Sequence, residues 1–323
     1  MPQEICNTFN IFSMTLKQYF KAKCTEINKG LESCLPKIEK EAPSLWKSMD
    51  YSLFAKGKRL RPILMYAVYE SLKNSQMSAV NGQKKVVKAT ACAIEIVHTS
   101  SLILDDFPCM DDGKTRRGKP ANHLVFGEAT ALLAADALLT YAFELIAHEV
   151  PDKLGIELIR HLAKAVGTQG MIGGQIVDLQ SRGKIINYET LIYIHRHKTA
   201  ALFEYAARAG ALLAQADSTH VDSVVKYAAD LGLAYQITDD ILDVLETGKI
   251  PPNHHPEVNF VSIMGMENAK QKVDELIASA KHYLNRLDYR EAILSQIADY
   301  VDNRSNRNSL EFRIRKIQDV PIG

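Results

Sequence analysis

The stretch ALLAADALLTYAFEL, residues 131–145, decides the fold class of this chain. Its apolar residues cover nearly the whole circumference of a helix, interrupted by the charges of Asp136 and Glu144. A helix of this kind has to be buried on almost all sides, so it belongs inside a large bundle of neighbouring helices. Asp136 breaks the run before it reaches the ~18 apolar residues that a membrane span needs, so no membrane span is expected.

The positions of the prolines extend this prediction to the rest of the chain. Eleven prolines are present, and none falls in residues 152–250 or 257–320. Proline is the strongest helix breaker, and apolar residues in both spans recur at helical spacing. We therefore predict an all-α protein, a single large helical bundle of about ten or more helices. The expected helices are residues 14–34, 44–55, 59–74, 84–106, 127–148, 153–181, 187–215, 219–247, 266–287 and 290–318.

The domain organisation follows from the absence of a Gly/Ser-rich linker, a repeat or a low-complexity run. Residues 1–13 precede an internal methionine and are expected to form an N-terminal extension to a single domain of residues 14–323. The longest non-helical interruption is ETGKIPPNHHPEVNF, residues 246–260. A domain linker is one interpretation, but continuous helices on both sides favour a loop over an active site.

Composition excludes several classes of protein. The 323 residues include 46% hydrophobic and 24% charged residues and carry a net charge of +1. A disordered tail would be poor in apolar residues, and a nucleic-acid-binding protein would show a marked basic excess, so no nucleic-acid partner is expected. Five cysteines without a CxxC pair, and no signal-peptide pattern, favour a reducing, cytoplasmic location.

The first candidate site follows the predicted helix 84–106, in LDDFPCMDDGKTRRGKP, residues 104–120. This stretch contains four aspartates. Carboxylates at the end of a buried helix repel one another, and water screens them poorly there. A cation therefore has to balance them, and the four bases of the same stretch leave an internal salt-bridge network as an equally weighted alternative.

A second acidic cluster favours a metal site. In YQITDDILDVLE, residues 235–246, three aspartates share one side of a helix whose other positions are apolar. The nearest base that follows is Lys249, so the charge is not neutralised locally. Carboxylate oxygens without His or Cys suit a hard cation, and Mg²⁺ prefers one or two carboxylates together with substrate phosphates.

A polyphosphate substrate also needs cations from the protein. AKGKRLRP, residues 55–62, supplies four bases at a predicted helix start, where amide donors and the helix dipole favour anions. Further polar groups stand on otherwise apolar helices in HRHKTA, residues 195–200, and GGQIVD, residues 173–178. Each taken alone is more often a solvated charge or a satisfied core group, but their joint occurrence favours a site.

The ordered motifs GKRLRP, DDFPCMD, RRGKP, GGQIVD, HKTA and QITDDILD resemble those of the trans-isoprenyl diphosphate synthases, which include farnesyl and geranylgeranyl diphosphate synthases. The resemblance runs from about Tyr51 to Arg304. It implies a bundle around a central cavity and a homodimer. It also implies a Mg²⁺-dependent prenyltransferase that condenses isopentenyl diphosphate with an allylic diphosphate (dimethylallyl, geranyl or farnesyl).

The resemblance also implies roles for individual residues. The Mg²⁺ ions, three when diphosphate is bound, are expected on the catalytic carboxylates Asp105, Asp106, Asp111, Asp239, Asp240 and Asp243. The allylic substrate is expected to contact Arg116, Gln175, Lys198, Thr199, Gln236 and Lys249, with Lys198 also counted as catalytic. Isopentenyl diphosphate is expected to contact Lys58, Arg61, His98 and Arg117. Glu257 stands where the family usually has a lysine, which leaves Lys249 to act alone.

Product length is expected to depend on the helix that carries the first motif. One helical turn rises 5.4 Å, about the length of an extended isoprene unit, so the side chains upstream of Asp105 measure the growing tail. Ser100 and Ser101 stand where synthases that stop at fifteen carbons have an aromatic residue. We therefore favour at least twenty carbons, with a floor formed by Val97 or by a neighbouring bulky residue such as Tyr141 or Phe143.

Three alternatives remain. A farnesyl diphosphate synthase differs only in product length. A class I terpene cyclase usually lacks GKRLRP and has a different second motif, so we consider it less well supported. A non-catalytic subunit that modifies a synthase commonly loses one aspartate motif, whereas both are present here.

Overall fold

The computed structural model describes residues 14–35, 40–73, 82–250, 258–287 and 292–305. These residues confirm the all-α class. The helices are α1 (Leu16–Cys34), α2 (Pro43–Leu53), α3 (Leu60–Leu72), α4 (Gln83–Asp105), α5 (Asn122–Phe126), α6 (Glu128–Glu149), α7 (Asp152–Val166), α8 (Met171–Ser181), α9 (Tyr188–His195), α10 (Ala201–Leu213), α11 (Ser218–Thr247), α12 (Phe260–Met264), α13 (Met266–Leu284) and α14 (Ala292–Ser305). A π-helical turn, Arg196–Ala200, joins α9 to α10, and strands β1 (Thr115–Arg116) and β2 (Lys119–Pro120) form a small antiparallel hairpin.

Two predicted helices are wrong in extent. The predicted helix 153–181 is divided into α7 and α8, because the chain folds tightly at Gly170, where a Cβ would lie 2.0 Å from the carbonyl oxygen of Ala165. The predicted helix 187–215 is interrupted by the π-helical turn. The extension 1–13 and the end of the predicted helix 290–318 lie outside the described residues.

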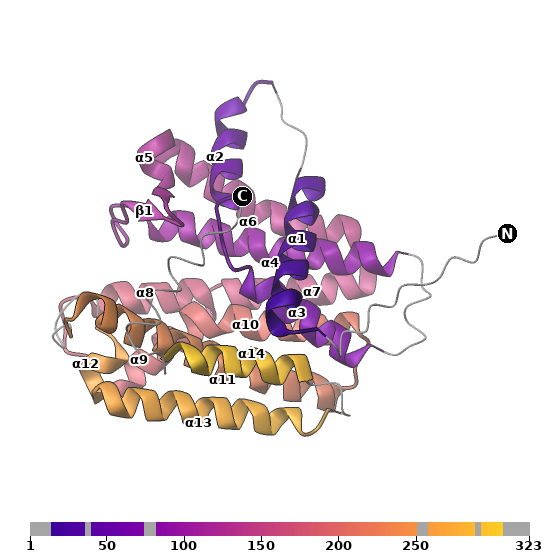
Figure 1. Cartoon of the computed structure of the whole chain (residues 1–323). Helices are drawn as coiled ribbons and strands as arrows, with labels where there is room; N and C mark the ends of the chain where they lie inside the picture. Colours follow the sequence, from indigo (N-terminus) through magenta and orange to yellow (C-terminus); the bar gives the residue numbers. More distant parts are fainter. Residues whose placement is uncertain (1–13, 36–39, 74–81, 251–257, 288–291, 306–323) are drawn as a thin grey trace.

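The helices are arranged in layers (Figure 1). The pair α4 and α6 forms one layer, α3 and α10 lie beneath it, and α11 with α13 and α14 forms the next. The hairpin that follows α4 and the short helix α12 that follows α11 lie at the same end of the bundle. Both aspartate motifs lie at or near the C-terminus of their helix, on that side of the bundle.

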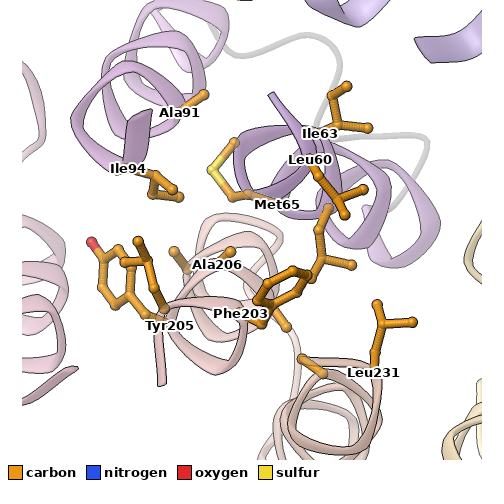
Figure 2. Packing of buried hydrophobic residues seen from close by; sticks show 14 of the residues in the cluster. Leu60, Ile63, Met65, Ala91, Ile94, Phe203, Tyr205, Ala206 and Leu231 are labelled. Atoms are coloured by element: carbon orange, nitrogen blue, oxygen red, sulfur yellow. The ribbon is translucent and has the colours of Figure 1, made fainter. Parts of the chain in front are cut away.

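The core lies where α3, α4, α10 and α11 meet. Figure 2 shows Met65 of α3 and Ile94 of α4 pointing toward Tyr205 and Ala206 of α10. All four residues are almost completely buried. Close packing at this level fixes the spacing of the helices that carry the site.

Two of the described helices, α4 and α6, are long and apolar enough to cross a membrane by length and composition alone. The apolar window of α4 is 78% buried within the protein, as expected for a core helix. That of α6 is only 39% buried, and Leu132 and Leu133 are 47% and 60% exposed. The prediction that this helix is buried on nearly all sides is therefore wrong for one face. From the sequence, the run 131–145 was expected to be too short and too polar to span a membrane. The complete helix α6 is longer than this run, and it passes the test of length and composition.

Candidate active site

The first aspartate motif lies at the end of α4. Asp105 is the last residue of the helix, and Asp106 caps it, its N–H directed at the carbonyl oxygens of the preceding turn. Asp106 is 1% exposed, whereas Asp105 is half-buried. Burial raises the pKa of Asp105 to about 6, and the neighbouring Asp111 adds to the rise although Lys198 opposes it. The positive charges near Asp105 therefore do not fully offset the effect of its burial.

The hairpin β1–β2 supplies the counter-charge to Asp106. Arg116 donates from Nε over 2.9 Å and from Nη2 over 2.5 Å to one oxygen of this carboxylate. The hairpin turns at Arg117 and Gly118, both with positive φ, which directs the two arginines of RRGKP to different partners. A Cβ at Gly113 would lie 2.5 Å from Asp106 Oδ1, so a larger residue there would displace this carboxylate. The internal salt bridge weighed in the sequence analysis therefore exists for this carboxylate.

The second aspartate motif lies in the last third of α11. Asp240 is 5% exposed and accepts hydrogen bonds from the backbone N–H of Phe260, at 2.9 Å, and from Gln236 Nε2, at 3.1 Å. Burial nevertheless raises its pKa to about 7, and the flanking Asp239 and Asp243 add to the rise. Asp240 is thus a second buried carboxyl whose ionisation the bundle opposes.

The HKTA motif connects the two acidic clusters. Lys198 donates to Asp178 over 2.8 Å, and although burial opposes it, the charges of Asp105 and Asp178 raise the pKa of Lys198. Thr199 donates to Gln236 over 2.9 Å, and Gln236 in turn donates to Asp240. Both residues lie in the π-helical turn, an arrangement that is frequent at functional sites.

Helix α8 can approach this turn because of a glycine. A Cβ at Gly174 would lie 2.4 Å from the backbone nitrogen of Lys198. Gln175, the next residue, places its amide nitrogen 3.9 Å from the sulfur of Met110, and its buried amide oxygen has no hydrogen-bond partner. The GGQIVD motif therefore packs directly between the first aspartate motif and HKTA.

A separate group of arginines surrounds His98. Nη1 of Arg61 lies 3.1 Å from Nε2 of His98, and the guanidinium lies over the ring of Phe203 at 4.8 Å. Burial lowers the pKa of His98 well below its usual value, and Arg61 and Arg117 lower it further, so the ring is neutral. Arg61 Nε and Arg117 Nη1 are buried donors without a hydrogen-bond partner. Unpaired cationic donors of this kind suit an anion.

A buried ion pair fixes the wall of this arginine group. Arg59 pairs with Glu95, which is 1% exposed, and donates to the carbonyl oxygens of Leu53 and Ala55 over 2.7 and 3.3 Å. Arg117 lies 3.1 Å from the same oxygen of Glu95. Arg59, the second basic residue of KRLR, is thus a structural residue, whereas Arg61 faces His98.

Two arginines that the sequence analysis missed contact the acidic motifs. Arg182, just after α8, pairs with Asp111 and donates to the carbonyl oxygen of Met110. Arg304 of α14 pairs with Asp239, lies 4.2 Å from the centre of the Tyr235 ring, and is 7% exposed. Neither lies in a recognisable motif, and 65 or more residues separate each from its partner. Only the folded chain reveals them.

Some predicted site residues take no part in the ion pairs and hydrogen bonds described above. Lys58 and Lys249 are exposed, and Glu257 lies outside the described residues. Val97 is buried, and Ser100 donates to the carbonyl oxygen of Ala135 in α6 over 2.8 Å. The described residues contain no group of three His, Cys, Asp or Glu side chains close enough to enclose a metal ion.

The described site combines buried carboxyls, a central lysine and unpaired guanidinium donors at one end of a helical bundle. This arrangement fits an enzyme that handles a strongly anionic substrate. A family model described as polyprenyl synthetase matches residues 42–293, so the chain belongs to the polyprenyl synthetase family.

Individual proteins that resemble this chain agree with the family assignment. Farnesyl diphosphate synthase of Geobacillus stearothermophilus is 38% identical over 305 residues, which cover 91% of this chain and 99% of that protein. Geranylgeranyl diphosphate synthase of Cyanophora paradoxa is 42% identical over 274 residues, covering 81% and 88%. The crystal structure of an FPP/GFPP synthase from Zymomonas mobilis matches with a TM-score of 0.79 and 32% identity, covering 89% and 98%. The chain is a prenyltransferase, and its relatives support short-chain prenyl diphosphate synthesis.

Proposed function

We propose that this enzyme condenses isopentenyl diphosphate head-to-tail with an allylic diphosphate and favours geranylgeranyl diphosphate, of twenty carbons, as its all-trans product. The observation that carries the proposal is Lys198, whose charge interacts with Asp105 and which lies one residue from the chain of hydrogen bonds to Asp240. These contacts support the proposal that the two acidic motifs act in one site. The unpaired guanidinium donors near His98 are proposed to bind a second anion.

The donor set fits Mg²⁺. Asp105 and Asp240 are carboxyls whose pKa burial raises to about 6 and about 7, so a nearby divalent cation would favour their ionised forms. Mg²⁺ needs only one or two protein carboxylates when substrate phosphates complete its shell, which agrees with the lack of a closed cluster among the described residues. The proposed ligands are Asp105, Asp106, Asp111, Asp239, Asp240 and Asp243, for three ions. Bound there, Mg²⁺ supplies electrostatic stabilisation of the departing diphosphate.

The protein's own groups would act on both substrates. Lys198 and Arg116 are placed to stabilise the negative charge that develops as the allylic diphosphate leaves, with Thr199, Gln236, Gln175 and Lys249 around them. Arg61, Arg117, His98 and Lys58 would hold isopentenyl diphosphate so that its alkene lies against the allylic carbon. The alkene then bonds to the allylic cation, and the departed diphosphate accepts the proton that is lost.

Product length is proposed to follow from small side chains upstream of Asp105. Ser101 donates to the carbonyl oxygen of His98 and is half-buried, while Ser100 packs against α6 and Val97 lies a turn deeper. With serines at both positions, α4 itself carries no aromatic ring there. Ser100→Tyr should shorten the product. An unchanged chain length would refute the proposal that side chains upstream of Asp105 set the product length.

A homodimer is proposed from the exposed face of α5, α6 and α7. Leu124, Val125, Leu132, Leu133 and Ile156 are each 46–60% exposed. Exposed apolar residues on neighbouring helices favour association, and a second copy offers the same residues. The measurement is the mass in solution, and Leu133→Glu should shift it toward the monomer. A cytoplasmic location stays a prediction.

One incubation tests the proposed reaction. The purified protein is mixed with isopentenyl diphosphate, dimethylallyl diphosphate and Mg²⁺, and the products are sized. A twenty-carbon diphosphate supports the proposal, a fifteen-carbon product supports farnesyl diphosphate synthesis, a cyclic hydrocarbon supports a terpene cyclase, and no product supports a non-catalytic subunit. Asp105→Ala should lower turnover by orders of magnitude with the fold intact, and a wild-type rate would refute the metal assignment.

A further inference from the structure

A pair of cysteines joins α1 to α4 away from the active site. Cys34 is the last residue of α1, and Cys92 is a completely buried residue of α4. A Cβ at Gly30, one helical turn before Cys34, would lie 2.8 Å from the sulfur of Cys92. The Cys92 thiol is therefore seated against the last turn of α1, the turn that ends at Cys34.

Solvent access differs between the two sulfurs. A cavity of about 260 Å³ opens beside this junction and is lined by Cys34, Ser33, Lys88 and Tyr141, among others. Cys92 is not part of its lining. A small reagent that enters the cavity therefore meets Cys34 first, and Cys92 lies behind it.

The electrostatic environment divides the two thiols in the same way. The neighbouring Cys92 thiol lowers the pKa of Cys34, although burial opposes this, and Ser33 and the charge of Lys88 lower it further. The Cys34 thiol, together with burial, raises the pKa of Cys92. This environment favours the thiolate at Cys34 and the protonated form at Cys92, and the thiolate is the nucleophile in disulfide exchange.

The pair has no part in the proposed condensation. Cys92 precedes Asp105 by thirteen residues (105 − 92), which is about 20 Å along α4. The cavity beside Cys34 lies at that remote end of the helix, next to the end of α6, where Tyr141 donates to the carbonyl oxygen of Cys34. A chemical event here would reach the site only through helix packing.

We propose that Cys34 and Cys92 form a redox-active dithiol, in which Cys34 exchanges with a small disulfide such as glutathione disulfide and Cys92 resolves the product. The Cys34 thiolate attacks one sulfur of glutathione disulfide, forms a mixed disulfide and releases one glutathione thiolate. Cys92 then attacks Cys34 Sγ, and the second glutathione leaves as a thiol that carries the Cys92 proton. Starting from one thiolate and one thiol, the protein loses two electrons and one proton, and one glutathione disulfide becomes one glutathione thiolate and one glutathione thiol.

The resulting disulfide would tie α1 to α4. In a reducing compartment such a bond forms only when the oxidant rises, so it reports redox state and does not serve as a permanent staple. Because Cys34 also bonds to Tyr141 of α6 through its carbonyl oxygen, the crosslink would join the start of the chain to both core helices.

The experiment treats the full-length protein with glutathione disulfide and maps every cysteine by mass spectrometry after non-reducing digestion. The wild type should yield a peptide pair linked through Cys34 and Cys92. Cys92→Ala should stop at glutathione on Cys34, and Cys34→Ser should show neither. Cys24→Ser, which alters a half-buried thiol outside the pair, should behave as wild type.

Two results would overturn the proposal. One is glutathione on other cysteines while Cys34 remains unmodified in the wild type. The other is a linkage of Cys34 to any cysteine except Cys92. Because Cys92 is fully buried, the folding of Cys92→Ala is checked by thermal unfolding. If this variant does not fold, the mixed disulfide on Cys34 can be trapped in the wild type early in the time course, which also identifies Cys34 as the residue that reacts first.

Discussion

Asp240→Asn should stabilise the metal-free enzyme, and the gain should depend on pH. The carboxyl is 5% exposed, and burial raises its pKa from 3.8 to about 7. Between these values the folded protein holds a proton that the unfolded chain has lost. The stability of the wild type therefore falls as pH rises from about 4 to 7, and above pH 7 the whole penalty is present.

The magnitude follows from the shift. At 1.36 kcal/mol for each pKa unit, a rise from 3.8 to about 7 costs about 4 kcal/mol in free energy of unfolding once Asp240 is ionised. Asparagine carries no charge, and its amide oxygen can still accept from the N–H of Phe260. The variant should thus match the wild type near pH 4 and exceed it by about 4 kcal/mol above pH 7, roughly 6 °C in melting temperature for a chain of 323 residues.

The assay is thermal or denaturant unfolding in a chelator at pH values from 4 to 9. Glu267→Gln removes a carboxylate that is 85% exposed on its side chain, and should change stability by no more than about 0.5 kcal/mol at any pH. Adding Mg²⁺ with inorganic pyrophosphate should narrow the gap, because the wild type would use Asp240 as a ligand. A stability difference that does not change with pH would refute the burial argument.

Three further changes test particular contacts. Arg304→Gln removes the partner of Asp239, so the metal-free protein should lose about 1–3 kcal/mol of stability. Because Arg304 and Mg²⁺ would compete for Asp239, the melting temperature of the variant should rise more with Mg²⁺ and pyrophosphate than that of the wild type. Equal rises would contradict this competition. Gly210→Ala places a Cβ 2.5 Å from the carbonyl oxygen of Met65 and should cost about 1–3 kcal/mol in chemical denaturation, against no change if α10 can shift. Glu95→Ala leaves two arginines without their buried counter-charge and should cost about 3–5 kcal/mol by the same assay; a neutral result would show that an anion or water replaces it.

The helices were largely predictable because their signals are local. Proline positions and apolar spacing indicated the bundle, whereas the short helices α5 and α12, the β1–β2 hairpin and features that depend on close approach were missed. The division between α7 and α8 required Gly170 to fit against a carbonyl oxygen of the preceding turn. The π-helical turn that carries Lys198 leaves no distinct pattern in the sequence.

The family motifs were predictable for a similar reason. Each aspartate cluster lies within one short segment, so the sequence alone indicates that a cation or a base, nearby or distant, has to balance its charge. It also places Arg61 and His98 among the anion-binding candidates, and these two side chains do meet, 3.1 Å apart. What the motifs do not indicate is how each carboxylate is balanced in the folded protein.

By itself, then, the sequence determined the helical class, the two acidic motifs and the family. The tertiary structure decided that Arg116, Arg182 and Arg304 pair with Asp106, Asp111 and Asp239. It also decided that Asp240 is buried, and that Cys92 of α4 is seated against the last turn of α1, which ends at Cys34. The physical reason is that helix formation depends on neighbours within a few residues, whereas burial and ion pairing depend on groups that only packing brings together.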